Sequence, residues 1–407
     1  MRFHVLGIPH TITRDDYSAC AFTQKVLKFC KMMHRRGHTV YHYGHKDSIV
    51  ECTEHISVTD NTTLEKAYGH YNWRTDFFKH DSGDHAHLTF NLRAAEQVSV
   101  RKQAGDFLLL FWGHGHSHIA ACHANDLIVV EPGIGSHNNV LAPFAVFESY
   151  AVMHYVYGKY NIQPRFYDCV VPNYFDINDF IDASSITIKN PFRLDLYGDE
   201  WGLNATSTKL KKILDLPDGY VLVIARLIST KGIQIAVEAC LHLNLKLVIA
   251  GQGQLKDCVS ELLIDKMGHN LEHIGYVEPA ERSILFAKAK CLMLPTLYAE
   301  PFGGASVEAQ ISGIPVITTD WGAFAETVKH GVSGYRCRTL EQFIWALKNV
   351  DSLDRKRIRS DAIANYSLTK VATMYEEYFS MLQTVKFGSG FYDVSKERLG
   401  LSWLEKK

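Results

Sequence analysis

Short apolar runs alternate with stretches of helical periodicity along the whole chain. The first apolar run, residues 2–6, ends at Gly7 and is followed by a polar loop and a helical pattern over residues 21–36. Short apolar runs are typical of buried parallel strands, and the helical stretches between them are typical of helices that cover such a sheet. The pattern therefore predicts an α/β protein with doubly wound parallel sheets.

The same alternation divides the chain into two parts. In the first part, further strands are expected at residues 40–43, 106–112, 126–131 and 169–172, a partly helical stretch at 114–124 and a helix at 144–157. In the second part, strands are expected at residues 220–226, 245–251, 273–277, 291–294 and 315–318, with helices between them. A chain of 407 residues exceeds what one core usually holds. We expect a first Rossmann-like domain at residues 1–180, a connection at 181–218, a second Rossmann-like domain at 219–385 and a C-terminal tail at 386–407.

Composition narrows the class of protein. Hydrophobic residues make up 46% of the chain and the net charge is −1, which favours a globular protein without general attraction to polyanions. The nine cysteines include no Cys-x-x-Cys pair, so reduced thiols are expected. Gly7 and Pro9 interrupt the N-terminal apolar run and no apolar stretch reaches membrane-spanning length. We expect a cytoplasmic protein.

The first predicted helix is rich in basic residues, which allows contact with a membrane as one interpretation. Within the first predicted helix lie five basic residues, Lys25, Lys28, Lys31, Arg35 and Arg36. A solvated helix face is the favoured interpretation, and peripheral contact with anionic lipid or a polyanionic acceptor is the alternative.

The most informative stretch is Glu300-Pro-Phe-Gly-Gly-Ala-Ser-Val-Glu308, which follows a predicted strand and opens a helix. Gly303 and Gly304 allow a ligand to approach the backbone, and the unpaired N–H groups at a helix start favour an anion such as a diphosphate. Glu308, about one turn into the helix, can accept two hydrogen bonds from a vicinal diol such as a ribose.

Two cations follow an earlier strand of the same domain. Arg226 ends the strand at residues 220–226, Lys231 follows it, and both can neutralise a departing diphosphate. The chain contains no Asp-x-Asp tripeptide of the kind that holds a metal in many sugar transferases, so no metal is expected.

At these residues the chain resembles the retaining glycosyltransferases of family 4. The resemblance covers nearly all of the second domain, and residues 251–253, 275–277, 313–317 and 322–326 also fit it. It implies the GT-B fold, in which two Rossmann-like domains face an inter-domain cleft. It also implies transfer of a hexosyl or pentosyl group from a nucleotide-diphosphate sugar with retention of anomeric configuration. We expect a UDP- or GDP-linked donor and no cofactor.

The resemblance assigns roles to individual residues. It implies that Glu308 holds the ribose and that Glu300 and the amides of Phe302, Gly303 and Gly304 hold the sugar and diphosphate. Arg226 and Lys231 match the phosphate cations. The loops at Gly253 and at Tyr276 and Val277 belong to the donor site, the second near the base. A first-domain histidine of the family has three candidates here, His114, His116 and His118, of which we favour His114 as catalytic.

Several alternatives remain open on the sequence alone. The acceptor can be a glycan, a lipid-linked sugar, another small molecule or, less favoured, a base in DNA, because acceptor contacts lie in the divergent first domain. A sugar phosphorylase or a nucleotide-sugar epimerase could use the same fold, and a non-catalytic nucleotide- or glycan-binding module is the third possibility. A metal site at the three histidines is conceivable but disfavoured.

Overall fold

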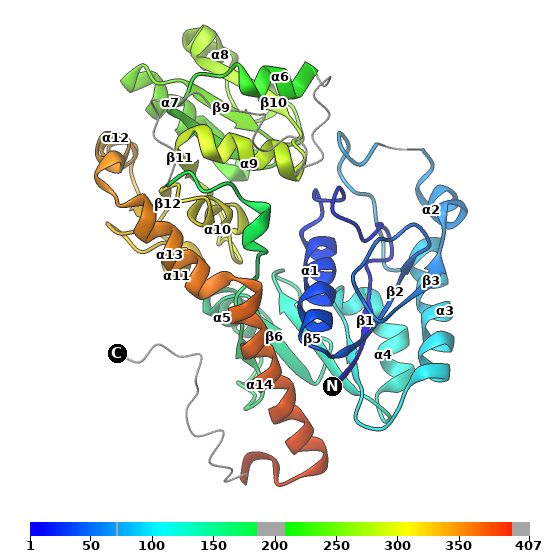
Figure 1. The fold of residues 1–407 in the computed structure, drawn as a ribbon. Helices are drawn as coiled ribbons and strands as arrows, with labels where there is room; N and C mark the ends of the chain where they lie inside the picture. The colour runs from blue at the N-terminus through cyan, green and yellow to red at the C-terminus, as the bar shows by residue number, and fades with distance from the viewer. Residues whose placement is uncertain (71, 185–207, 393–407) are drawn as a thin grey trace. The chain divides into compact units, whose positions relative to one another are not determined.

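The computed structural model describes residues 1–70, 72–184 and 208–392, which form two compact units, each built on one parallel sheet (Figure 1). The first unit comprises Met1–Tyr71, Phe78–Tyr174 and Ser367–Lys407, and the second comprises Asn72–Phe77 and Phe175–Tyr366. Helices cover both sheets. The predicted doubly wound α/β fold is confirmed.

The first unit contains a seven-stranded parallel sheet in the order β3-β2-β1-β4-β5-β6-β7. Its strands are β1 (Arg2–Leu6), β2 (Thr39–His45), β3 (Glu54–Thr59), β4 (Phe107–Leu109), β5 (Ile128–Ile134), β6 (Phe144–Phe147) and β7 (Cys169–Val170). Its helices are α1 (Ala21–Arg35), α2 (Asn61–Tyr68), α3 (His85–Arg101), α4 (Ser117–His123), α5 (Tyr150–Tyr160) and α14 (Leu368–Phe387), with a 3-10 turn η1 (Gly113–His116) before α4. The strand order reverses between β1 and β4, which is where ligands bind in open parallel sheets.

The apolar positions of α1 show how the sequence builds this core. Val26, Phe29, Cys30 and Met33 recur at intervals of three and four residues, so they share one face of the helix. All four are fully buried against β1 and β4. Truncating a buried phenylalanine such as Phe29 to alanine costs about 3–5 kcal/mol of stability.

Helix α14 completes the core of the first unit, although it lies near the end of the chain. Its buried face contacts the same apolar cluster as α1, and the ring of Phe379 lies 4.8 Å from that of Phe3. The sequence analysis had placed this segment in the second domain, within residues 219–385. The difference arises because an amphipathic pattern shows that a helix covers a core without showing which core it covers.

The second unit contains a six-stranded parallel sheet in the order β10-β9-β8-β11-β12-β13. Its strands are β8 (Tyr220–Ile224), β9 (Leu247–Ala250), β10 (Leu271–Gly275), β11 (Ala289–Leu294), β12 (Val316–Thr319) and β13 (Gly334–Cys337). Its helices are α6 (Thr208–Leu214), α7 (Ile233–Leu243), α8 (Glu261–Met267), α9 (Pro279–Lys288), α10 (Gly304–Ile311), α11 (Phe324–Thr327), α12 (Leu340–Asn349) and α13 (Arg355–Tyr366). One apolar cluster lies on each face of this sheet.

One predicted element is wrong. Residues 144–157 were expected to form a helix, but β6 occupies Phe144–Phe147 and α5 begins only at Tyr150. Apolar and aromatic residues dominate both parts of this run, so periodicity could not separate a buried strand from the helix after it. Ser149 marks the boundary, because its side chain accepts a hydrogen bond from the Val152 N–H and caps α5.

Parts of the predicted connection and tail cannot be compared with the structure. Residues 185–207, most of the connection expected at 181–218, lie outside the described residues, as do residues 393–407 of the expected tail.

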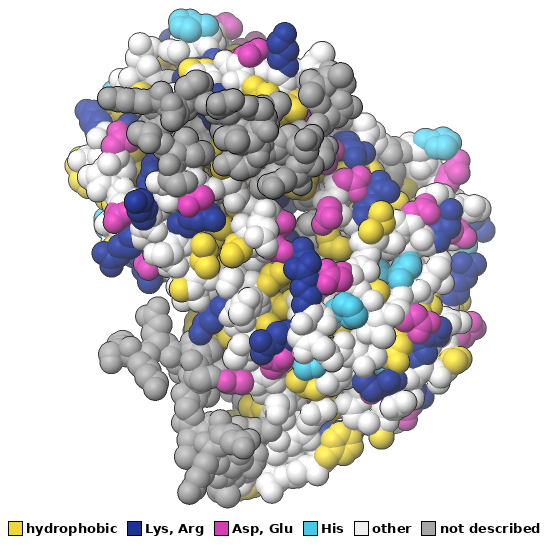
Figure 2. Space-filling view, viewed as in Figure 1, with side chains coloured by type: hydrophobic (Ala, Val, Ile, Leu, Met, Phe, Trp, Pro, Cys, Tyr) yellow, Lys and Arg dark blue, Asp and Glu magenta, His cyan; other side chains and the backbone are white. Residues whose placement is uncertain are grey.

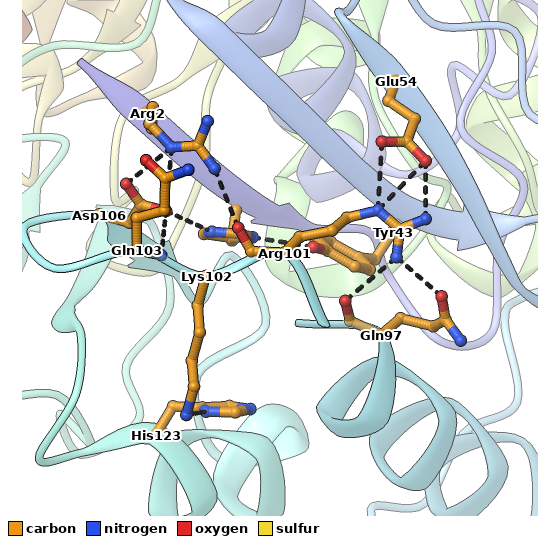
Figure 3. Close-up of polar contacts among 10 residues, drawn as sticks. Arg2, Tyr43, Glu54, Gln97, Arg101, Lys102, Gln103, Asp106 and His123 are labelled. Atoms are coloured by element: carbon orange, nitrogen blue, oxygen red, sulfur yellow. Dashed lines mark hydrogen bonds and ion pairs between the residues drawn. The ribbon is translucent and has the colours of Figure 1, made fainter. Parts of the chain in front are cut away.

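A polar network ties together the amino edge of the first sheet (Figure 3). The buried Asp106 carboxylate, just before β4, accepts hydrogen bonds from Arg2 Nε at 3.0 Å and from the Gln103 N–H at 2.9 Å. His4 Nε2 lies 3.0 Å from the same carboxylate, and His4 Nδ1 lies 2.8 Å from the Tyr43 hydroxyl. Because this network lies at the edge opposite the strand ends where ligands bind, we assign it a structural role.

Charged side chains of both signs are interspersed over the face drawn in Figure 2. On the first predicted helix, Arg35 pairs with Glu51 at 2.8 Å. The next residue, Arg36, pairs with Glu376 at 2.5 Å. Lys25 is buried and paired with Glu148, so neither a solvated face nor a lipid contact describes it.

Within the described ranges, no helix combines the length and apolar character that crossing a bilayer requires.

Candidate functional site

The carboxyl edge of the second sheet collects the sequence-predicted donor residues. The strand order reverses between β8 and β11, so the loops that follow these two strands flank the switch point. Lys231 lies in the loop after β8, and Glu300 lies in the loop after β11. Gly253 follows β9, and Tyr276 follows β10. The topology thus gathers residues from four strand ends onto one edge of one sheet.

Lys231 and Glu300 contact each other directly. The Lys231 ammonium donates to Glu300 Oε2 at 2.7 Å and to the Tyr298 hydroxyl at 2.6 Å. Both charged side chains are mostly buried, with 15% and 13% of their surfaces exposed. Burial lowers the pKa of Lys231, but the Glu300 carboxylate and the Tyr298 hydroxyl outweigh it and raise that pKa above its ordinary value. The site therefore holds a permanent cation beside a carboxylate.

A glycine turn positions Lys231. Gly232 adopts a left-handed conformation with φ of 64° and begins α7. A Cβ atom at this position would lie 2.0 Å from the carbonyl oxygen of Pro295, at the end of β11. The absence of a side chain therefore lets the loop after β8 reach the loop after β11, which brings the lysine to the glutamate.

The start of α10 provides unpaired donors beside this pair. Gly303 has φ of 78° and precedes α10, and no side chain among the described residues caps the helix. A Cβ atom on Gly303 would lie 2.4 Å from the ring of Phe324, so the turn requires glycine. Phe302 is buried in the apolar core, whereas Gly304 has no neighbour closer than 3.9 Å to its would-be Cβ. An uncapped helix start binds anions through its free N–H groups.

Glu308 lies on the next turn of α10 and has a partner that the sequence did not indicate. Its Oε1 atom lies 3.2 Å from a guanidinium nitrogen of Arg282, on α9. The carboxylate is 10% exposed and the guanidinium 21%. Arg282 carries no sequence signal of its own, because an arginine on an amphipathic helix is ordinarily a solvated residue.

The second predicted cation lies in a different environment. Arg226 is exposed after β8, and in the part of the chain that the structure describes its guanidinium forms no hydrogen bond or ion pair. Among those residues, no contact joins it to Lys231, Glu300 or Glu308.

Tyr276 and Val277 differ in exposure. Tyr276 is half-buried, and its carbonyl oxygen accepts a hydrogen bond from Lys209 at 2.9 Å. Val277 is 4% exposed and belongs to an apolar core cluster, so its side chain is structural.

The first unit has a pocket of about 520 Å³ beside its own switch point. His114 is exposed and lines this pocket, together with Phe22, Trp112 and Glu131. The remaining lining residues are His80, Asp81, Ser82, Phe111, Gly113, Gly115, Pro132, Gly133, Ile134, Ser136, Asn138 and Asn139. The described lining therefore combines aromatic rings, amides, hydroxyls and carboxyls and includes no lysine or arginine.

The three clustered histidines occupy separate environments. Only His114 lines the pocket. His116 is fully buried, its Nε2 lies 3.0 Å from the carbonyl oxygen of Gly7, and burial lowers its pKa to about 3. His118 is exposed and lies near Cys122 on its own helix. Across residues 1–70, 72–184 and 208–392, no group of three or more His, Cys, Asp or Glu side chains is arranged to hold a metal ion.

Glu131 is a pocket residue for which the sequence patterns predicted no role. It lies within β5 and accepts a hydrogen bond from the Leu141 N–H at 2.9 Å. Burial raises the pKa of Glu131 to about 7. A glutamate within the otherwise apolar run Ile-Val-Val-Glu was the available signal, because a buried carboxyl in a strand is costly without a function or a partner.

Part of the chain is similar in sequence to known glycosyltransferases. Residues 206–362 match the sequence model of the glycosyl transferases group 1 family. An uncharacterized glycosyltransferase from Methanocaldococcus jannaschii is 29% identical over 189 residues, which cover 44% of this chain and 46% of the relative. Glycogen synthase from Pseudomonas aeruginosa is 34% identical over 121 residues, which cover 28% of this chain and 23% of the relative. The chain thus spans less than half the length of these relatives.

Solved structures show the fold over nearly the whole chain. Sucrose-phosphate synthase from Thermosynechococcus elongatus matches with a TM-score of 0.65 at 14% identity, covering 95% of this chain and 100% of the other. The catalytic domain of starch synthase IV from Arabidopsis thaliana, bound to ADP and acarbose, matches with a TM-score of 0.65 at 12% identity. The match covers 94% of this chain and 99% of the other. The two parallel-sheet Rossmann-like domains are those of the GT-B fold, and the second unit is similar in sequence to group 1 glycosyl transferases.

Proposed function

We propose that the protein is a glycosyltransferase that moves a sugar from a nucleotide-diphosphate donor to an acceptor with retention of anomeric configuration. The observation that carries this proposal is the Lys231–Glu300 ion pair, which together with the uncapped start of α10 flanks the switch point of the second sheet. A cation, a carboxylate and free backbone donors at one strand edge suit a diphosphate joined to a sugar.

Each residue of this site has a proposed role. The amides at Gly303 and Gly304 and the Lys231 ammonium bind the diphosphate, and Arg226 adds a second positive charge. Glu300 accepts hydrogen bonds from sugar hydroxyls. Glu308 accepts from the ribose diol, and Arg282 orients its carboxylate. The loops at Gly253 and Tyr276 border the base.

The proposed reaction needs no metal, because arginine and lysine stabilise the charge of the leaving group. The bond between the anomeric carbon and the diphosphate oxygen breaks, and its electron pair leaves with the nucleotide diphosphate. The acceptor oxygen bonds to the anomeric carbon on the same face, and its proton passes to a phosphate oxygen of the leaving group. Added chelator is expected to leave the rate unchanged.

We assign the acceptor to the pocket of the first unit. Its aromatic rings, amides and carboxyls fit the apolar faces and hydroxyl groups of a sugar, and the absence of lysine and arginine from its described lining disfavours a phosphorylated group there. His114 and Glu131 lie where they can hydrogen-bond to acceptor hydroxyls.

Product analysis tests this function. Incubation with UDP- and GDP-sugars and a panel of neutral glycans, followed by NMR of the product, is expected to show the donor's anomeric configuration in the new linkage. An inverted linkage would remove the proposed mechanism, and release of free sugar-1-phosphate that depends on inorganic phosphate would identify a phosphorylase instead.

A further inference from the structure

A short segment from the first half of the chain belongs to the second unit. Residues Asn72–Phe77 lie in sequence between α2 and α3, which are both in the first unit, yet they group with the second. We refer to Asn72–Phe77 as the Trp73 segment.

A buried side chain anchors the Trp73 segment. Gln252, in the loop after β9, is 7% exposed, and its amide nitrogen donates to the carbonyl oxygens of Trp73 at 2.6 Å and of Asp76 at 3.4 Å. A buried amide without a partner is costly, so these contacts stabilise both the loop and the segment. The segment is therefore part of the structure of this edge of the sheet.

Two further contacts orient the Trp73 indole. Arg74 Nε donates to Glu278 Oε1 at 2.7 Å, and its guanidinium lies 4.1 Å from the centre of the Trp73 ring. The Trp73 ring meets the Tyr276 ring edge to face, with centroids 5.9 Å apart and planes at 83°. Both aromatic side chains are half-buried, so part of each stays accessible.

The Trp73–Tyr276 pair lies where the base of a bound nucleotide would extend. Gln252 and Tyr276 follow neighbouring strands, β9 and β10, at the same carboxyl edge that carries Lys231 and the start of α10. A nucleotide whose diphosphate lies at α10 extends its base away from the phosphates, along that edge. Aromatic side chains stack on bases regardless of base identity, because every base has a π-face.

We infer that Trp73 forms part of the nucleotide-binding site and recognises the base of the donor by stacking. This inference rests on the proposed function and deepens it. Stacking reads the face of a base and not its hydrogen-bonding edge, so Trp73 contributes affinity without choosing among uracil, guanine and adenine. The choice among bases then falls to the polar groups of the loops after β9 and β10.

The test compares nucleotides with a ligand that has no base. Dissociation constants for UDP, GDP, ADP and inorganic pyrophosphate are measured by equilibrium dialysis on the full chain. Trp73→Ala is expected to weaken nucleotide binding about five- to a hundredfold, the range that one stacked base spans. Pyrophosphate binding is expected to stay unchanged, and Trp73→Phe is expected to restore most of the nucleotide affinity.

The chain offers a matched control. Trp345 on α12 is also partly exposed and meets Tyr335 edge to face at 5.1 Å. Trp345→Ala is expected to leave all four dissociation constants unchanged.

Three results would overturn the inference. Unchanged nucleotide affinity in Trp73→Ala would make the segment purely structural, and tighter binding would mean that it covers the site. An equal loss of pyrophosphate affinity would mean that the substitution disturbs the loops generally. Failure of the proposed function has a different signature, since the wild-type protein would then bind none of the nucleotides.

Discussion

The pH dependence of folding offers a quantitative check on Glu131. Replacing Glu131 with glutamine keeps the size of the side chain and removes its titration. Burial raises the pKa of this carboxyl to about 7, whereas an unfolded glutamate has a pKa of about 4.3. The folded state therefore binds more protons than the unfolded state over the interval between these two values.

The sign and size of the effect follow from linkage. Because the folded pKa is raised, the stability contributed by the protonated carboxyl is present below the unfolded pKa and is lost as the pH rises through the folded pKa. Integrating the difference in bound protons gives a loss of about 2 kcal/mol between pH 5 and pH 7, and little further loss above pH 8.

The assay is urea unfolding of the wild type and of Glu131→Gln at pH 5, 6, 7 and 8. The difference in unfolding free energy between the two proteins isolates Glu131, because the neutral buried histidines, whose linkage has the opposite sign, contribute equally to both. Glu96→Gln, at an exposed position on α3, is the control and is expected to show no such difference. A wild-type-minus-variant difference that is flat across this range, or that rises with pH, would refute the assignment of a protonated Glu131.

Four further outcomes are expected. Lys231→Ala should lower kcat about a hundredfold or more, since it removes a cation from the departing diphosphate, and Lys231→Arg should recover part of the rate in steady-state assays. Glu308→Ala should weaken donor binding about ten- to a hundredfold in titration calorimetry, with kcat changed less. Arg282→Ala should weaken donor binding in the same direction but less, and an effect on kcat alone would contradict its role beside Glu308. Asp106→Asn should lower the unfolding free energy by about 1.5–3 kcal/mol. Its kcat/KM, measured under conditions where the variant stays folded, should be retained, since the network of Figure 3 lies at the sheet edge opposite the one where ligands are proposed to bind.

The sequence predicted most strands because their signal is local. The runs at β1, β8 and β9 are short and apolar, and each ends at a glycine or a polar turn that marks the carboxyl edge. The placement of the proposed donor residues at one edge could be predicted for the same reason, since in a parallel sheet every loop that follows a strand reaches one edge. Lys231 and Glu300, 69 positions apart, were therefore expected to share an edge before any coordinates.

The features that could not be predicted from the sequence depend on contacts between residues far apart in the chain. The apolar face of α14 fits either core equally well as a pattern, and only packing shows that Phe379 meets Phe3. The Trp73 segment has no periodicity, so its grouping with the second unit had no local signal. Arg282 became a candidate through its contact with the Glu308 carboxylate. Glu131 stood out as a carboxyl in an apolar run, and only the structure shows that it lines a pocket.

Nucleotide binding tests the central claim most directly. Titration calorimetry of the full chain with UDP, GDP and ADP is expected to show one site per chain for at least one nucleotide. The Lys231→Ala, Glu308→Ala double variant is expected to bind that nucleotide at least about a hundredfold more weakly, because it removes one charged partner from the diphosphate and one from the ribose. Equal affinity in the two proteins would contradict a donor site at the switch point of the second sheet.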